Sequence, residues 1–357
     1  MRGALWPPEV TRSYWPRAVC TRSCIIRSSV TSPGLEAALL RGWYEGAWWT
    51  WLLRPLEVLY RAVTGLRRLL YRLGVYRAYR APVPVVIVGN ITLGGTGKTP
   101  IIVALVEALQ ARGLRPGVVS RGYGAMAGGF PHTVSATSSA GDCGDEPLLI
   151  FQRTGAPCVV DPDRPAAVRS LLASHPVDIV LCDDGLQHYA LARDFEIAVL
   201  DAERGVGNGF CLPAGPLREP PSRLETVDAL LWRGGTAVET GVTLEVDGVF
   251  ALRPMPGQRP PGAGAQVHAV AGIGQPQQFQ ATLTAMGYRV IAHNFPDHHR
   301  FSATDITALD DAPVIMTEKD AVKCRAFAGE NHWYLKISAR LPETVVERIA
   351  ALATRTP

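Results

Sequence analysis

The stretch Gly89-Asn-Ile-Thr-Leu-Gly-Gly-Thr-Gly-Lys-Thr-Pro100 decides the fold of this chain. It follows the apolar residues 84–88 and precedes the apolar, helix-like residues 101–110. A strand, a glycine-rich loop and a helix in this order are the context of a phosphate-binding P-loop. Backbone N–H groups of the loop and the positive end of the helix dipole would bind a polyphosphate. The sequence therefore predicts a nucleotide site.

The loop also assigns roles to single residues. Lys98 would reach the β- and γ-phosphates of ATP and assist their chemistry, and Thr99 would offer its hydroxyl to Mg²⁺. Thr92 departs from the strict pattern, which has glycine five residues before Gly97. We predict that the nucleotide contacts Thr92, Leu93, Gly94, Gly95, Thr96, Gly97, Lys98 and Thr99.

Apolar strands alternate with helical segments after the loop, which indicates an α/β fold. We expect a P-loop NTPase-type, mostly parallel sheet with helices on both faces. A smaller α/β unit is expected to begin near residue 267, with a helix at 276–286. The remaining expected strands and helices are 117–120, 157–160, 178–182, 195–200 and 228–232, and 99–112, 146–153 and 163–174.

We expect five parts along the chain: an extension at 1–34, a membrane-interface helix at 35–80, a P-loop domain at 81–240, a hairpin and linker at 241–264, and a C-terminal α/β domain at 265–357. The hairpin would turn at Asp247-Gly248. The extension lacks the continuous apolar region of a secretory signal. It is either disordered or upstream sequence translated from a wrongly assigned start.

The N-terminal part is basic and rich in tryptophan. Residues 1–80 contain 13 Arg against four Glu, and six of the eight Trp lie in the first 51 residues. Trp and Leu followed by Arg are typical of a helix at a membrane interface. Glu45, Arg54 and Glu57 interrupt the segment too often for a membrane span. We favour peripheral membrane contact over packing on the protein's own core, and we infer neither a nucleic-acid nor a protein partner.

Cysteine usage gives the redox setting. The seven cysteines are odd in number and scattered, and Cys20 and Cys24 lack a matching second pair for a metal site. A reducing cytosolic environment fits this pattern best.

Two carboxylates follow the apolar residues 178–182. Asp183 and Asp184 stand at the end of that expected strand, where P-loop proteins complete the Mg²⁺ shell directly or through water. Because successive strand residues point to opposite sides, only one of the two need face the nucleotide. A solvated turn at Gly185 is the alternative.

Three further charged segments are candidates for chemistry. Asp145, in Gly141-Asp-Cys-Gly-Asp-Glu-Pro147, would either cap the helix that follows or act in catalysis. Phe295-Pro-Asp-His-His-Arg-Phe301 gathers acid, imidazole and guanidinium groups in one loop and is a plausible catalytic loop. The charges of Thr317-Glu-Lys-Asp-Ala-Val-Lys323 fit an ordinary solvated helix start equally well.

Seven motifs occur in one order along the chain. Their set resembles the tetraacyldisaccharide 4′-kinase family, which acts in the lipid A pathway of Gram-negative bacteria. The resemblance runs from about residue 38 to 350 and includes the Trp- and Arg-rich helix. The motifs are Gly94-Gly-Thr-Gly-Lys-Thr-Pro100, Ser120-Arg-Gly-Tyr-Gly124, Gly144-Asp-Glu-Pro147, Asp183-Asp-Gly-Leu-Gln-His188, Leu212-Pro-Ala-Gly-Pro-Leu-Arg-Glu219, Phe295-Pro-Asp-His-His299 and Thr317-Glu-Lys-Asp320.

The resemblance implies a reaction. The γ-phosphoryl group of ATP would pass to the 4′-hydroxyl of an acylated glucosamine disaccharide 1-phosphate, a lipid A precursor. Asp145 would be the catalytic base, paired with His298, and the pair would orient the hydroxyl and relay its proton. Closure of the two domains would bring the pair together and exclude water.

The resemblance also places the remaining candidates and the enzyme itself. It implies a peripheral enzyme at the cytoplasmic face of the bacterial inner membrane, where the acceptor's acyl chains lie. Asp183, Asp184 and Gln187 would belong to the nucleotide and Mg²⁺ side. The candidates for substrate contacts are Arg121, Arg164, Asp297 and Glu219.

Two rival functions are the alternatives to the one that this resemblance implies. A membrane-associated, ATP-gated switch of the partitioning type carries Lys immediately before the paired glycines, where this chain has Leu93. A P-loop kinase with a soluble small-molecule acceptor would leave the Trp- and Arg-rich helix without a role.

Overall fold

The computed structural model describes residues 35–126, 128–309 and 311–354. The predicted extension at 1–34, with Cys20 and Cys24, therefore lies outside the described residues. The chain divides into two compact units at Leu39 and Leu40. Of the first unit only helical residues 35–39 are described, the start of α1 (Leu35–Glu45). All elements after α1 belong to the second unit.

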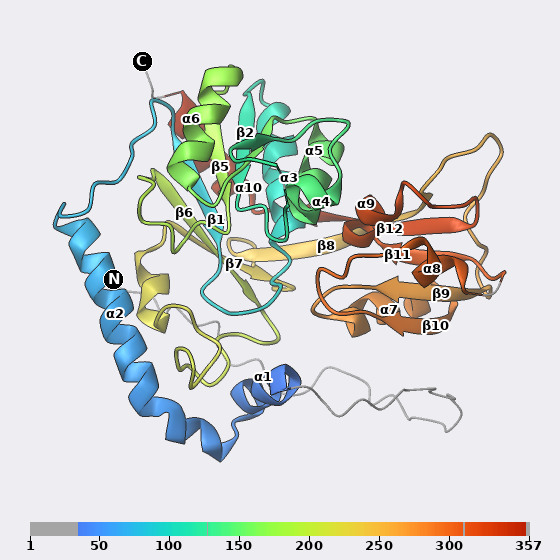
Figure 1. Ribbon diagram of the computed structural model, residues 1–357, viewed down its shortest axis with the longest axis horizontal. Helices are drawn as coiled ribbons and strands as arrows, with labels where there is room; N and C mark the ends of the chain where they lie inside the picture. The colour runs from blue at the N-terminus through green and yellow to red at the C-terminus, as the bar shows by residue number, and fades with distance from the viewer. Residues whose placement is uncertain (1–34, 127, 310, 355–357) are drawn as a thin grey trace. The chain divides into compact units, whose positions relative to one another are not determined.

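One sheet runs through the described residues, with the strand order β10-β9-β11-β12-β8-β7-β6-β1-β5-β2-β4-β3 (Figure 1). Its strands are β1 Val85–Gly89, β2 Pro116–Ser120, β3 His132–Thr133, β4 Cys158–Val160, β5 Ile179–Asp183, β6 Phe195–Asp201, β7 Ala229–Arg233, β8 Gly241–Ala251, β9 Gln266–Ala271, β10 Arg289–Asn294, β11 Val314–Thr317 and β12 His332–Arg340. The α-helices after α1 are α2 Arg54–Arg72, α3 Lys98–Gln110, α4 Ala140–Cys143, α5 Asp145–Thr154, α6 Arg164–Ser174, α7 Pro276–Ala285, α8 Ala303–Thr307, α9 Glu318–Cys324 and α10 Glu343–Ala353. Two 3₁₀ helices span Trp48–Leu53 and Pro221–Thr226.

The N-terminal lobe, formed by β1 to β7 and the helices packed on them, has the predicted parallel sheet. Strands β7, β6, β1, β5, β2 and β4 pair in parallel, and only the short β3 runs antiparallel. The central strand β1 is buried along its whole length because helices cover both faces of the sheet. Helix α3 buries Ile101, Leu105 and Leu109 against the sheet. The predicted α/β class is confirmed.

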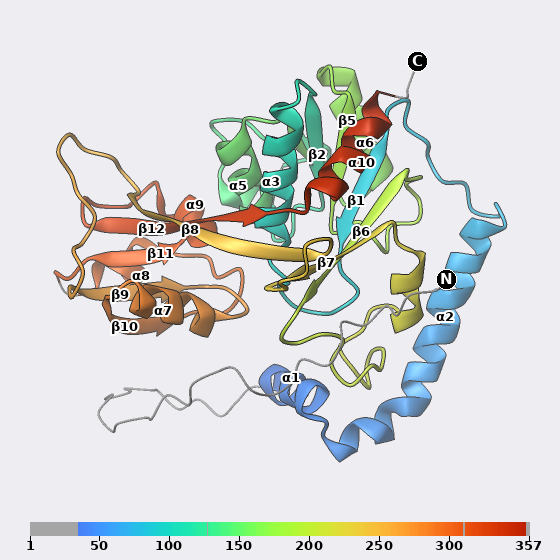
Figure 2. The same cartoon turned by 180° about the vertical axis from the view of Figure 1, so that it is seen from behind.

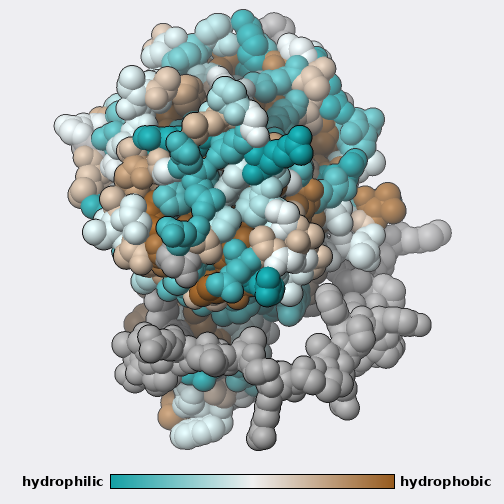
Figure 3. Space-filling view, turned by 90° about the vertical axis from the view of Figure 1, so that its right-hand side faces the viewer, coloured by the Kyte–Doolittle hydropathy of each residue, from teal (hydrophilic) through white to brown (hydrophobic). Residues whose placement is uncertain are grey.

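The C-terminal lobe, formed by β9 to β12 with α7, α8 and α9, is a smaller parallel sheet. Strand β9 pairs with β10 and β11, and β11 pairs with β12, all in parallel. Two buried apolar clusters lie in this lobe, one of them around Phe279 and Trp333 and the other around Phe301 and Met316. Figure 3 shows hydrophilic and hydrophobic residues interspersed over this end of the protein.

Strand β8 joins the two lobes, and the predicted hairpin at 241–253 is wrong. Residues Gly241–Ala251 form one strand that pairs in parallel with β7 at its start and antiparallel with β12 along its length. The pairing skips Asp247, and the next residue, Gly248, has φ 141°. The Asp-Gly pair therefore forms a β-bulge in a continuous strand, a feature that uses the same residue types as a tight turn.

Helix α10 returns to the N-terminal lobe after β12. Its residues Val345, Val346 and Ile349 are buried in the same apolar cluster as α3. The division into domains at residues 240 and 264 stays a prediction, and the packing of α10 favours assigning residues 343–353 to the N-terminal lobe. The segment predicted as a linker, 254–264, contains no helix or strand.

The N-terminal segment predicted as one interfacial helix is broken into pieces. Gly46, with φ 81°, ends α1, and the 3₁₀ helix Trp48–Leu53 leads into α2, whose second residue is Pro55. Helix α2 is the long blue helix of Figures 1 and 2. Among the residues that the structure describes, none of the helices is both long and apolar enough to span a bilayer.

Helix α2 turns its polar side toward the protein. The buried Glu57 accepts the backbone N–H of Cys211 at 3.1 Å, and Tyr60 donates its hydroxyl to the carbonyl of Arg218 at 2.9 Å. Leucines and valines on the opposite side of the helix are exposed, with Leu59 at 62% and Leu66 at 57%. This exposed row, which we call the outer stripe, consists of Leu52, Leu56, Leu59, Val63, Leu66, Leu69 and Leu73.

Candidate active site

The P-loop follows β1 as the sequence predicts. Gly94 has φ 95° and Gly97 has φ 70°, and α3 begins at Lys98 directly after the second of these left-handed residues. Thr92 is buried and forms an isolated β-bridge with Leu217, so it anchors the loop to the segment after residue 212. Its hydroxyl accepts a hydrogen bond from Asn90 Nδ2 at 3.4 Å, so the threonine that replaces the glycine of the strict pattern has a partner within the loop. The buried Thr96 hydroxyl has no hydrogen-bond partner among the described residues.

Lys98 lies between the loop and the predicted metal carboxylates. Its Nζ atom donates to Asn90 Oδ1 at 3.3 Å and lies 3.3 Å from Asp184 Oδ1. Gln187 donates to the carbonyl of Asn90 at 3.2 Å, next to the P-loop, and its contact with the nucleotide stays a prediction. Arg218 forms an ion pair with Asp184 at 2.9 Å. Neither Asn90 nor Arg218 stood out in the sequence, although Asn90 directly follows the strand that leads into the P-loop.

Asp183 and Asp184 differ in their surroundings. Asp183 ends β5, is buried, and accepts a hydrogen bond from Ser120 Oγ at 3.1 Å, whereas its Oδ1 has no hydrogen-bond partner among the described residues. Burial raises the pKa of Asp183, and the nearby Glu146 adds to that rise. Burial also acts on Asp184, but the charges of Lys98 and Arg218 lower the pKa of that carboxyl well below its usual range.

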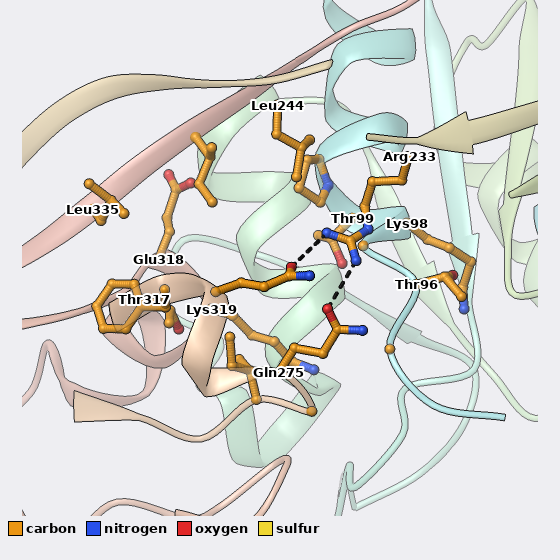
Figure 4. Close-up of a pocket in the computed structure, with 18 of the residues that line it drawn as sticks. Thr96, Lys98, Thr99, Arg233, Leu244, Gln275, Thr317, Glu318, Lys319 and Leu335 are labelled. Atoms are coloured by element: carbon orange, nitrogen blue, oxygen red, sulfur yellow. Dashed lines mark hydrogen bonds between the residues drawn. The ribbon is translucent and has the colours of Figure 1, made fainter. Parts of the chain in front are cut away.

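A cavity of ≈ 290 Å³ opens between the P-loop and the C-terminal lobe (Figure 4). One wall is the loop from Gly95 to Pro100. The opposite wall includes Gln275, Asp297 and Lys319, and the aliphatic side chains of β8 and β12 close one side. Arg233, at the end of β7, donates to Gln275 at 3.1 Å and so connects the lobes beside the loop (Figure 4). The volume is near the lower end for small-ligand sites.

Asp145 and His298 come from different lobes and are in contact. Asp145 begins α5 and is 5% exposed, and His298 belongs to the loop after β10. Nδ1 of His298 lies 3.0 Å and 3.2 Å from the two carboxylate oxygens of Asp145. His298 has φ 59°, a backbone conformation that is strained for a non-glycine residue. Closure of the lobes stays a prediction, since the structure describes one arrangement of them.

The charges around this pair set its protonation. Burial alone would raise the pKa of Asp145, but the hydrogen bond with His298 and the charges of Lys319 and Lys323 lower it to about 2. The hydrogen bond to Asp145 raises the pKa of His298 above its usual value, although burial and the charge of Lys319 act in the opposite direction. Asp145 is therefore ionised at neutral pH.

Two lysines on α9 complete the cluster. Lys319 Nζ lies 3.1 Å from Glu146 Oε1 and 3.3 Å from Asp297 Oδ1, and Lys323 Nζ lies 3.7 Å from Asp145 Oδ2. The sequence left these residues undecided between chemistry and a solvated helix start. Both side chains are largely buried and belong to the cluster. The sequence signal for Lys319 is its place in the Thr317-Glu-Lys-Asp320 motif, and Lys323 lies one helical turn further on.

The four residues predicted to contact the substrate lie in different settings. Asp297 lines the cavity, and Arg121 is exposed after the end of β2. Arg164 is buried and donates to the backbone carbonyls of Asp161 and Asp183, which argues against a direct phosphate contact. Glu219 is also buried and accepts the hydroxyl of Tyr189 at 2.7 Å. Arg164 and Glu219 therefore stabilise the structure around the site through buried hydrogen bonds.

The comparison with protein families gives one match that covers most of the chain. The family model LpxK, described as tetraacyldisaccharide-1-P 4′-kinase, matches residues 49–354. A tetraacyldisaccharide 4′-kinase of Pseudomonas paraeruginosa is 55% identical over 306 residues, which cover 84% of this chain and 92% of the relative. Another, from Azotobacter vinelandii, is 53% identical over 317 residues, covering 85% and 93%.

A solved structure agrees with these relatives. The crystal structure of LpxK from Aquifex aeolicus in complex with ATP is similar to this chain with a TM-score of 0.71 and 26% sequence identity. The similarity covers 86% of this chain and 99% of that one. The resemblance drawn from the seven motifs is confirmed.

Proposed function

We propose roles for the site residues on the premise that this chain belongs to the tetraacyldisaccharide-1-phosphate 4′-kinase family. The chain is a kinase that carries out the ATP-dependent 4′-phosphorylation of lipid A biosynthesis. The observation that carries our assignment is the contact of Asp145 with His298 beside the cavity that the P-loop lines.

The donor side of the reaction is assigned to the P-loop. The backbone N–H groups from Gly94 to Thr99 bind the β- and γ-phosphates of ATP, with the N-terminal end of α3 directed at them. Lys98 neutralises charge on the phosphate that leaves and on the one that is transferred. The aliphatic wall of the cavity, formed by Leu244, Val246 and Leu335 with Ile337, is suited to the flat face of a base.

Oxygen ligands that fit Mg²⁺ lie on the P-loop side of the site, where Asp184 is 3.3 Å from Lys98. Asp183 offers a buried carboxylate oxygen without a hydrogen-bond partner in the described chain, and Thr99 lines the cavity. Within the described residues no group of three or more His, Cys, Asp or Glu side chains is arranged to hold a metal. Mg²⁺ suits this sparse set because it keeps waters and takes oxygens from phosphate. When bound, it neutralises charge on the triphosphate. We assign Asp183, Asp184 and Thr99 to it.

Asp145 is assigned as the base that receives the proton of the 4′-hydroxyl. With a pKa of about 2 it is a weak base, but the phosphoryl-transfer transition state is loose and the proton leaves late. The main task of Asp145 is therefore to orient the hydroxyl toward the γ-phosphorus. His298 holds the carboxylate in that orientation.

Helix α2 is assigned to the membrane surface, at the cytoplasmic face of the inner membrane. The outer stripe faces away from the protein, and the exposed Arg61, Arg67 and Arg72 flank it. Trp48 and Trp51 are exposed at its N-terminal end. Leucine, tryptophan and arginine in this arrangement bind the headgroup region of an anionic bilayer. The helix would thus keep the active site close to an acceptor whose acyl chains stay in the membrane.

The proposed function can be tested by identifying the molecule that receives the γ-phosphoryl group of ATP. We expect purified protein, incubated with γ-labelled ATP, Mg²⁺ and the tetraacyldisaccharide 1-phosphate in detergent, to transfer label to the lipid. Labelled inorganic phosphate without labelled lipid would contradict the assignment of a lipid acceptor. A soluble acetylated glucosamine disaccharide 1-phosphate, offered in parallel, tests the rival with a soluble acceptor, which predicts equal rates on both.

A further inference from the structure

The two ring nitrogens of His298 face partners of opposite charge. Nδ1 lies 3.0 Å from a carboxylate oxygen of Asp145, and Nε2 lies 3.3 Å from Nζ of Lys319. The ring of Tyr123 packs against the imidazole at a centroid distance of 4.8 Å. Both nitrogens therefore have defined partners, and the imidazole is held between them.

The partners decide which nitrogen carries the proton. An ammonium group has three donors and no acceptor, so a hydrogen bond between Lys319 and Nε2 requires a lone pair on Nε2. A neutral imidazole with a lone pair on Nε2 carries its proton on Nδ1. That proton is donated to Asp145. With Nδ1 occupied by a proton, His298 cannot also accept a proton from Asp145 at this atom.

Lys319 is held in place by both lobes. Its ammonium group contacts Glu146 of the N-terminal lobe at 3.1 Å and Asp297 of the C-terminal lobe at 3.3 Å. The helix that carries it is capped by Thr317, whose hydroxyl accepts the N–H of Asp320. The Asp320 carboxylate in turn accepts the backbone N–H of Gly272 at 2.8 Å. The ammonium therefore has a fixed position relative to His298.

The composition of the chain favours a specific role for lysine at this position. Only four of its 36 basic residues are lysines, yet two of those four stand on the short helix α9 beside Asp145. If any cation sufficed, arginine would be the expected choice in this chain. An ammonium is a compact charge with freely rotating donors, so it can contact three carboxylates and an imidazole together, whereas a guanidinium donates only in a fixed plane.

We propose that Lys319 is a positioning residue that keeps His298 in the Nδ1–H form, so that His298 only donates to Asp145 and Asp145 alone receives the proton. The proposal rests on the assignment of Asp145 as the base. In the reaction the 4′-oxygen bonds to the γ-phosphorus while the bond from that phosphorus to the β–γ bridging oxygen breaks. The 4′-hydroxyl proton ends on the Asp145 carboxylate and ADP leaves. The proton relay through His298 that the motifs suggested is replaced by a donor role.

Other charges around His298 act in both directions. Asp297 accepts the backbone N–H of His298 at 3.0 Å, and the hydrogen bond to Asp145 raises the pKa of the imidazole. Lys319 lowers that pKa. The charged and titratable groups that surround His298 are Asp145 and Glu146 on α5, Asp297 and His299 on its own loop, Lys319 and Lys323 on α9, and Tyr123 after β2.

The tautomer of His298 can be measured directly. The full chain, labelled with ¹⁵N-histidine, has eight histidines, and His298→Gln identifies the signal of interest. Long-range ¹H–¹⁵N spectra above the pKa of His298 should show a protonated Nδ1 and an unprotonated Nε2. A protonated Nε2 in the unsubstituted protein would overturn the proposal without any variant having to fold.

Variants of Lys319 then test whether this residue sets the tautomer of His298. Lys319→Met should introduce the Nε2–H form and raise the pKa of His298, because a nearby positive charge is lost. Lys319→Arg, which keeps the donor and the charge, should restore the Nδ1–H form in part. Lys336→Met removes the lysine that pairs with Asp247 outside the cluster and should change neither quantity. An unchanged tautomer and pKa in Lys319→Met would overturn the role of Lys319.

Kinetics separate this proposal from the assignment of Asp145. Lys319→Met should lower kcat about tenfold or more with little change in KM for ATP, and should move the acid limb of kcat to higher pH. If Asp145→Asn leaves kcat unchanged, the base assignment fails, while the tautomer measurement still reports on Lys319. If the tautomer responds to Lys319→Met but kcat does not, the positioning role in catalysis fails.

Discussion

The two ends of the active site differ in the groups that form them: backbone groups at one end and charged side chains at the other. The end assigned to ATP is built mainly on one continuous stretch, residues 89–100, whose proposed binding groups are mostly backbone N–H groups placed by two left-handed glycines. The end assigned to the acceptor is assembled from side chains that are 153 and 21 residues apart along the chain, Asp145, His298 and Lys319. Backbone amides do not titrate near neutral pH, whereas the function of this second cluster depends on the protonation of Asp145 and His298.

This difference predicts which kinds of substitution damage each end of the site. A cradle of backbone groups depends on conformation, so it is damaged by changes that alter φ or fill its space. A cluster of charged side chains depends on each member, because removing one leaves the others buried without their partner. The predictions below test that contrast, in order of decreasing expected effect.

The largest effect is expected at the acceptor end. Asp145→Asn keeps the shape of the side chain but removes its ability to accept a proton, and kcat should fall about 10²- to 10⁴-fold. KM for ATP should change little, as measured by initial rates with labelled ATP. Asp142→Asn is the matched control and should keep kcat, because this half-buried residue lies in the capping box of α4 and accepts the backbone N–H of Ser139. A normal kcat in Asp145→Asn would remove the distinction between the two ends.

The second-largest effect is expected from Lys98, the single charged side chain in residues 89–100. Lys98→Met should lower kcat about 10²- to 10³-fold, as expected when one preorganised donor to the transferred group is lost. Lys98 also forms the ion pair with Asp184, so the loss should be accompanied by weaker binding of Mg²⁺–ATP. Isothermal titration with a non-hydrolysable ATP analogue measures that binding. A loss confined to kcat would show that Lys98 acts only in the transition state.

The conformation of the loop is tested by Gly97→Ala. The residue has φ 70°, and a Cβ atom would lie 2.7 Å from Cδ of Arg233. The left-handed conformation alone costs about 1–2 kcal/mol for a non-glycine residue, equivalent to roughly a 5- to 30-fold weaker affinity for ATP. Gly95→Ala meets no atom within 4 Å and is the control. Equal affinities for the two variants would contradict a cradle that depends on conformation.

We expect pH to change kcat, which depends on the acceptor end, more than it changes the affinity for ATP. The pKa of His298 is raised above 6.5 by Asp145, and the imidazolium that forms below it lowers the basicity of that carboxylate. We expect kcat to fall as pH drops through that value, by up to about tenfold per pH unit, while ATP affinity stays level. Asp145, with a pKa of about 2, stays ionised throughout. A kcat that is flat down to pH 5.5 would contradict this.

The smallest effect on the chemistry is expected from α2. Replacing Leu59 and Leu66 of the outer stripe by Ser should weaken binding to anionic vesicles about tenfold per residue, because each leucine loses about 1.5 kcal/mol of apolar burial in the bilayer. The free energy of unfolding should stay within about 0.5 kcal/mol, since neither side chain is buried in the fold. Flotation with vesicles and chemical denaturation measure the two quantities. Unchanged flotation would refute the membrane role.

The contrast between the two ends also explains what the sequence could reveal. The strand, loop and helix of the P-loop are encoded within 26 consecutive residues, 85–110, and the structure agrees with their predicted boundaries to within two residues. Local geometry dictates such a site. The pairing of Asp145 with His298 needed the resemblance to a family, because no local pattern relates residues on different lobes.

Other features were missed or wrong for physical reasons. Lys319 has the sequence environment of a solvated helix start, and only the tertiary structure shows its buried contacts with Glu146 and His298. The Asp247-Gly248 pair indicated a turn, but pairing with β12 along its whole length holds the strand continuous. Periodicity predicts that α2 is amphipathic, but it does not show which face the protein covers.

The position of α10 has a consequence for how the protein is made. Its residues Val345, Val346 and Ile349 fill the cluster that also contains Ile101 and Leu105 of α3, although the whole C-terminal lobe separates these segments along the chain. On the ribosome, the N-terminal lobe must therefore wait with an open apolar face until the second lobe has been synthesised. The lobe that binds ATP is the first to be translated and the last to be completed.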